Sequence, residues 1–219
     1  MLALTTPYLW YTTRATGLVT LVLFTMVVSL GALVANRAGG TVVGRFEINE
    51  LHRSLSVVAV LFLAIHVVTT VLDSFVSTGP ASVLIPLTSS YKRVPIALGT
   101  VAVDLVLAVW LSSLAKARLA NATWRFLHWF SWLAFATSLV HAVTAGTDSR
   151  RGVGLVVVVV CAGIGAGAGV WRVLARPPRA AGRTALSPLS GGPSSAPAGG
   201  PGERTAEAAR SSSRSPERR

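Results

Sequence analysis

Five apolar stretches, each long enough to cross a lipid bilayer, dominate this chain of 219 residues. A transmembrane helix needs about 20 mostly apolar residues. The stretches lie near residues 15–36, 51–76, 94–115, 123–145 and 152–174. Charged residues make up only 13% of the chain, which is too few to cover the surface of a water-soluble globule. The sequence therefore predicts an all-α integral membrane bundle of about five spans within residues 1–176.

The distribution of charge predicts the orientation of the bundle. The net charge is +12, and the basic residues lie mostly at the ends of the apolar stretches or in the last 43 positions. This pattern is typical of a membrane protein, and we expect no nucleic-acid partner. Loops rich in Lys and Arg face the cytoplasm. We therefore expect a multi-pass protein of the plasma (cell) membrane, with the N-terminus outside and the C-terminus inside.

The composition changes at about residue 177. Residues 177–219 are rich in Pro, Gly, Ser and Arg, with almost no large apolar side chain after Leu189. Such a segment buries too little apolar surface to offset the entropy of ordering it, so we predict a disordered basic tail. Its arginines are either solvated or attracted to a partner or to anionic lipid, at about 1 kcal/mol per charge near the membrane surface.

All four histidines of the chain lie in two of the apolar stretches. His52 and His66 are 14 residues apart in the second stretch, and His128 and His141 are 13 apart in the fourth. At about 1.5 Å per residue, the members of each pair are roughly 20 Å apart along their helix. The second and fourth spans run in the same direction. We therefore expect His52 and His128 at one depth near the cytoplasmic face, and His66 and His141 at another near the outer face.

Imidazoles matched in depth on two helices predict two haem sites stacked across the membrane. Haem iron accepts imidazole as an axial ligand, and helix bundles build cofactor sites from facing helices. The single cysteine, Cys161, excludes covalent attachment through a CxxCH motif. The competing interpretation is that the histidines are ordinary polar groups bonded to neighbouring helices. Ionisable residues are rare inside membranes, so four of them paired in depth favour the haem sites.

The spacings of 14 and 13 residues place the two histidines of a helix on its faces differently. On an ideal helix a 14-residue step returns to nearly the same face, whereas a 13-residue step does not. The fourth span therefore needs a local distortion, a tilt or favourable rotamers to present both rings to the interior of the bundle.

At about residues 9–150 the chain resembles the ferric reductase-like transmembrane domain, which occurs in ferric reductases, NADPH oxidases and the haem-binding subunit of a bacterial methionine sulfoxide reductase system. The specific element is the two histidine pairs. The supporting elements are Trp-Arg-Phe-Leu-His-Trp at 124–129, His-Ala at 141–142, Gly-Thr-Asp at 146–148, Leu-Trp-Tyr at 9–11 and Arg-Ala-Thr-Gly at 14–17.

The resemblance implies two noncovalent b-type haems. The inner haem iron would be bound by His52 and His128, and the outer haem iron by His66 and His141. Many relatives continue into a module that binds flavin and nicotinamide, whereas this chain continues into the predicted tail. The resemblance therefore does not supply an electron donor within this chain.

Arginines lie where the haem propionates should emerge. Arg53 and Arg125 are close in sequence to His52 and His128. We expect these two arginines to pair with the propionates of the inner haem, and Arg14 with those of the outer haem. Anchoring of the helices at the membrane surface explains each arginine equally well.

Asp104 lies near the middle of the third stretch, where a carboxylate usually faces the interior of the bundle. One interpretation is an acceptor for the N–H of a haem-ligand imidazole, or a group that handles protons. The other is a structural partner for a Thr, Trp or Arg side chain. The sequence leaves both open.

A glycine-rich string at 163–169 has the form GxGxxA. A dinucleotide site would need a preceding strand, a following soluble helix and an acidic residue about 20 positions later. The sequence shows none of these, so we expect no flavin or NAD(P) site in this chain. The spacing of Gly163 from Gly167, and of Gly165 from Gly169, instead favours close packing between helices.

These features predict a di-haem b-type cytochrome that moves electrons from the cytoplasmic side to an extracytoplasmic acceptor, as a membrane subunit of an oxidoreductase. We assign no catalytic residue, and we expect a separate cytoplasmic flavoprotein as NAD(P)H-dependent donor. The acceptor stays open among a ferric complex, dioxygen, a quinone and a redox protein. The alternative is a non-redox membrane protein, such as a transporter or assembly factor, whose histidines handle a metal or protons. Two sites about 20 Å apart fit that alternative poorly.

Overall fold

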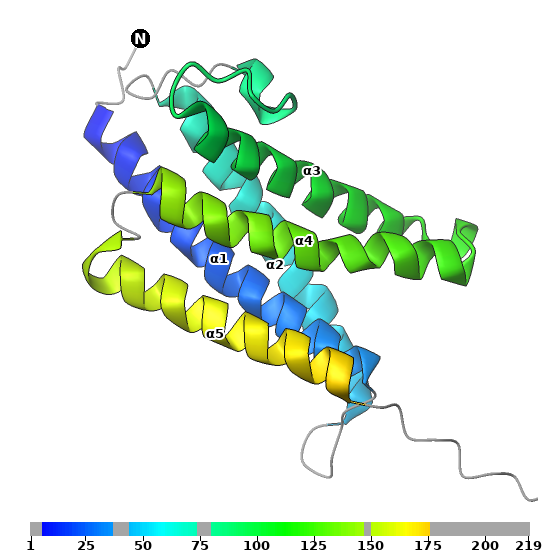
Figure 1. Cartoon of the computed structure of the whole chain (residues 1–219). Coiled ribbons are helices and arrows are strands. Elements are labelled where there is room, and N and C mark those ends of the chain that lie inside the picture. Colours follow the sequence, from blue (N-terminus) through cyan, green and yellow to red (C-terminus); the bar gives the residue numbers. More distant parts are fainter. Residues whose placement is uncertain (1–5, 37–43, 74–79, 147–149, 176–219) are drawn as a thin grey trace, which may run out of the picture. The chain divides into compact units, whose positions relative to one another are not determined.

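Each apolar stretch forms one long α-helix in the computed structural model of the chain (Figure 1). The structure describes residues 6–36, 44–73, 80–146 and 150–175. The helices are α1 (Thr6–Ala35), α2 (Arg45–Leu72), α3 (Arg93–Leu114), α4 (Asn121–Ala145) and α5 (Gly152–Leu174), with the short 3-10 turns η1 (Pro80–Val83) and η2 (Lys116–Arg118). All five helices are long and apolar enough to cross a membrane. The predicted all-α bundle of five spans is confirmed.

The first helix begins at Thr6, well before the predicted start near residue 15. This early segment is polar in sequence, but two of its threonine hydroxyl groups bond to carbonyls of the same helix, whereas the buried hydroxyl of Thr13 has no partner among the described residues. Thr12 Oγ1 donates to the carbonyl of Tyr8 at 2.7 Å, and Thr16 Oγ1 donates to that of Thr12 at 2.7 Å. Such bonds let threonine continue a helix in an apolar environment, which a search for apolar residues does not register.

The helices associate as two hairpins and one added helix. The closest neighbours are α1 with α2 and α3 with α4, and α5 lies along α1 (Figure 1). A small buried core lies where α1, α4 and α5 meet, and its members are Leu21, Val28, Phe135, Val158 and Cys161. Phe24 packs its ring edge-on against Phe135, with centroids 5.9 Å apart. This core joins the two hairpins on one side, and α2 takes no part in it.

Glycines of α5 allow its close approach to α4 at two positions. A Cβ on Gly165 would overlap the ring of Phe135, and one on Gly169 would lie 3.3 Å from the ring of Trp132. A Cβ on Gly163 or Gly167 would meet nothing within 4 Å. The expected small-residue packing is therefore confirmed at Gly165 and Gly169 and wrong at the other two positions, which face away from neighbouring helices.

The five helices belong to one compact unit within Met1–Arg179. The predicted tail, 177–219, lies outside the described residues, so its disorder stays a prediction. The orientation of the termini across the membrane also stays a prediction.

We predict that Gly165→Ala lowers the thermal midpoint of the detergent-solubilised protein. The added methyl group must displace Phe135, which is only 4% exposed, and overpacking a core typically costs about 1–3 kcal/mol. Gly163→Ala is the matched control on the same helix, because its methyl group enters open space and alanine favours the helix over glycine by about 1 kcal/mol. Equal midpoints for the two variants would contradict the described packing of α5 on α4.

Candidate functional site

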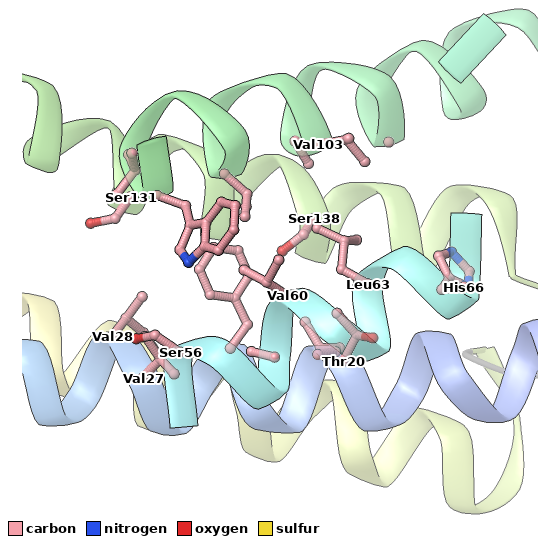
Figure 2. A pocket seen from close by; sticks show the side chains of 18 of the residues that line it. Thr20, Val27, Val28, Ser56, Val60, Leu63, His66, Val103, Ser131 and Ser138 are labelled. Carbon is pink, nitrogen blue, oxygen red and sulfur yellow. The ribbon is translucent and has the colours of Figure 1, made fainter. Parts of the chain in front are cut away.

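A cavity of about 1320 Å³ runs through the bundle and is lined mostly by residues of α1, α2, α3 and α4. This volume exceeds that of ordinary small-molecule pockets, about 300–1,000 Å³. Figure 2 shows that its lining combines apolar side chains, such as Val60 and Leu63, with the hydroxyl groups of Ser131 and Ser138. All four histidines line it. The cavity can therefore hold a large, mostly apolar ligand that has a few polar contact points.

His52 and His128 come together in this cavity from α2 and α4. Their ring centroids are 6.3 Å apart, and the ring planes are inclined at 64°. Two imidazoles bound to one metal ion through nitrogens at about 2 Å have ring centres roughly 6 Å apart. The spacing of this His52/His128 pair therefore leaves room for one metal ion between the rings.

Three of the four imidazoles are oriented by backbone carbonyl groups. His52 Nδ1 donates to Val27 O at 3.0 Å, and His66 Nδ1 donates to Thr13 O at 2.8 Å. His141 Nδ1 donates to Pro95 O at 2.7 Å. Because a carbonyl oxygen only accepts, each Nδ1 must carry the hydrogen. In the neutral ring Nε2 is then an unprotonated acceptor, which is the state needed to bind a metal.

His128 is held differently from the other three histidines. Its Nδ1 is buried and has no hydrogen-bond partner among the described residues. Its ring stacks on Trp124 of the same helix, with centroids 5.0 Å apart and an angle of 29°. Lys116 Nζ lies 4.2 Å from the centroid of the Trp124 ring, where a cation is attracted to the aromatic face. Stacking, rather than a hydrogen bond, positions this ring.

The geometry of α4 explains this difference. The helix is continuous from Asn121 to Ala145, so regular helical geometry relates its two histidines. At 3.6 residues per turn, 13 residues rotate the side-chain direction by about 140°, whereas 14 residues rotate it by about 40°. His141 lies against α3, and His128 leaves the helix in another direction, toward His52.

The His66/His141 pair also lines the cavity, as do Trp10 and Arg14 of α1. Arg14 Cζ lies 3.8 Å from the centroid of the Trp10 ring, which fixes the guanidinium beside the cavity. Two further predicted arginines, Arg53 and Arg125, line the cavity as well and are exposed. The structure thus places all seven predicted site residues at one cavity.

Arg172 of α5 is a cavity-lining residue that the sequence did not indicate as part of the site. Its Nη1 donates to Asn36 Oδ1 at 3.2 Å, and its Cζ lies 5.6 Å from the centroid of the Trp129 ring. Arg172 therefore links α5 to Asn36, which follows α1, and to Trp129 of α4. Only its position near the end of the fifth apolar stretch could have suggested this role.

Asp104 is half-buried on α3 and is not among the described residues that line the cavity. His52, His66 and His141 use backbone carbonyls as their acceptors. The structure therefore does not support Asp104 as the acceptor for these three imidazoles.

Comparison with known proteins identifies a family. The family model described as "Ferric reductase like transmembrane component" matches residues 16–139, more than half of the chain. Transmembrane domains of this kind generally bind haem. The searches of curated proteins and of solved structures returned no significant match.

Proposed function

Since this chain belongs to the ferric reductase-like transmembrane family, we propose that it is a di-haem b-type cytochrome that moves electrons across the plasma membrane to an extracytoplasmic acceptor. The observation that carries the proposal is the pairing of His52 with His128 at 6.3 Å in a large cavity. Haem, when bound, supplies reversible one-electron iron chemistry. The protein supplies the ligands, their orientation and an environment poor in water.

The residues at the cavity fit this cofactor. His52 and His128 face each other, and the Nδ1 atoms of His52, His66 and His141 donate to backbone carbonyls, which leaves their Nε2 atoms for iron. The apolar lining, such as Val60 and Leu63, matches a porphyrin face. Arg53 and Arg125 would donate hydrogen bonds to the propionates at one end and Arg14 to those at the other, since guanidinium groups pair well with carboxylates.

The basic surface near the His52/His128 pair supports cytoplasmic entry of electrons at this end. Exposed cations gather there on α2, η2 and α4, namely Arg45, Arg53, Lys116, Arg118 and Arg125. Such a surface attracts an acidic redox partner and speeds its encounter with the protein. The donor is a separate cytoplasmic flavoprotein that uses NAD(P)H.

We predict two noncovalent haems per purified chain, because the cavity contains two histidine pairs. A pyridine haemochrome assay against protein concentration measures this ratio, and acid–acetone should extract all of the pigment. A protein that binds a transition metal ion but no haem would contradict the proposal and favour the non-redox alternative.

We predict that the four ligand variants fall into two groups. His52→Ala and His128→Ala should each remove the same redox component, because these rings face each other, and His66→Ala and His141→Ala should remove the other one. Potentiometric titration of each variant measures which component is lost. If His52→Ala and His66→Ala abolish the same component, the pairing is wrong.

We predict that NADPH alone does not reduce the purified protein, and that reduction needs a flavin reductase or reduced flavin. The rate with an acidic flavoprotein should fall as salt rises, because exposed charges are screened. Arg118→Glu should slow it, and Arg151→Glu, an exposed arginine at the start of α5, is the matched control. Fast reduction by NADPH alone, or equal slowing by both variants, would contradict this assignment.

A further inference from the structure

We infer that three helix glycines, Gly17, Gly31 and Gly99, are positioning residues that seat the histidine rings of a neighbouring helix against backbone carbonyl groups. This seating, the contact of each ring with a glycine and its hydrogen bond to a carbonyl, is a property of the chain itself. Its effect on iron rests on the proposed function. It makes the two histidine pairs unequal, because the His66/His141 pair is seated at both rings and the His52/His128 pair at one.

Each of these glycines lies directly against a histidine ring. A Cβ on Gly99 would be 2.7 Å from Cε1 of His141, and a Cβ on Gly17 would be 3.0 Å from Cε1 of His66. A Cβ on Gly31 would be 3.3 Å from Cε1 of His52. Any side chain at these positions must push the ring away, least at Gly31 and most at Gly99.

The acceptor of each ring lies four residues before the glycine. Thr13 precedes Gly17 in this way, as Val27 precedes Gly31 and Pro95 precedes Gly99. In an α-helix the carbonyl of residue i−4 lies beside residue i and accepts its N–H. A glycine at i leaves the second lone pair of that oxygen uncovered. The imidazole lies over the glycine and donates its Nδ1 hydrogen to this lone pair.

The arrangement of glycine, carbonyl and histidine ring occurs twice between α1 and α2, because the glycines and the histidines have the same spacing. Gly17 and Gly31 are 14 residues apart on α1, and His52 and His66 are 14 residues apart on antiparallel α2. One register therefore seats both rings of α2. The helix α3 has one glycine, Gly99, and His141 of α4 lies against it, whereas the ring of His128 lies toward His52.

The hydrogen bond should act on a bound iron through the ring. An acceptor on Nδ1–H raises the basicity of the imidazole as a ligand, and a more basic ligand favours ferric iron and lowers the midpoint potential. Loss of the bond should therefore raise the midpoint potential of the haem that the ring binds. The His52/His128 pair has only one such bond, so its haem should exchange first with added free haem.

The first test measures the NMR signals of the histidine rings in the full-length chain in detergent, with or without haem. In ¹⁵N NMR of histidine-labelled protein we expect the Nδ1–H groups of His52, His66 and His141, but not that of His128, to show the signal of a hydrogen-bonded N–H. Gly99→Ala should change the signal of His141, and Gly31→Ala that of His52. Gly163→Ala and Gly167→Ala are matched controls, because a Cβ there meets nothing within 4 Å. A glycine variant that leaves its histidine signal as in the controls would overturn the seating.

The second test measures the midpoint potentials of the two haems. Gly31→Ala, the mildest change, should keep both haems and shift one midpoint potential upward, that of the component lost in His52→Ala. Gly99→Ala should lose or shift the component lost in His141→Ala. Unchanged potentials in both variants, in a protein that binds two haems, would overturn the inference while leaving the proposed function intact. A wild-type chain without haem would overturn the proposed function, and the NMR result would still decide the seating.

Discussion

The hydrogen bond from a buried imidazole N–H to a helix carbonyl is the interaction on which this site depends. A polar ring inside a membrane bundle needs a partner, since an unpaired polar group in an apolar environment is costly. The carbonyls of a helix are already engaged and are covered by side chains. Glycine removes that cover at Gly17, Gly31 and Gly99, so that a ring from the next helix can reach the oxygen four residues earlier. The same bond settles which ring nitrogen is left for a metal.

The two hairpins provide the hydrogen-bond acceptors of the histidine rings, and the core that joins the hairpins lies on one side of the bundle. The rings of α2 are seated on α1 and the ring of His141 on α3, so each hairpin orients its own ligands. The core of Leu21, Val28, Phe135, Val158 and Cys161 joins α1, α4 and α5 on one side, and α2 takes no part in it. The histidines of α2 and α4 line the cavity.

The sequence predicted the spans and the depth-matched pairing of His52 with His128, because both follow from counting residues along regular helices. The polar start of α1 was not predicted, since hydroxyl bonds such as that of Thr12 to Tyr8 are invisible to an apolar count. The acceptors of the imidazoles were also missed, because a backbone carbonyl has no signature of its own. The equal spacing of Gly17 from Gly31 and of His52 from His66 was a usable signal. Gly99 had no repeat that could have marked it, and the direction of His128 depends on side-chain packing against Trp124.

The central claim is that one iron lies within each histidine pair of a single chain. Anomalous diffraction at the iron absorption edge, from crystals of the full-length protein purified with its native pigment, tests this claim most directly. We predict two iron peaks per chain, one between the rings of His52 and His128 and one between those of His66 and His141. A single peak, or a peak bound by other residues, would contradict the account.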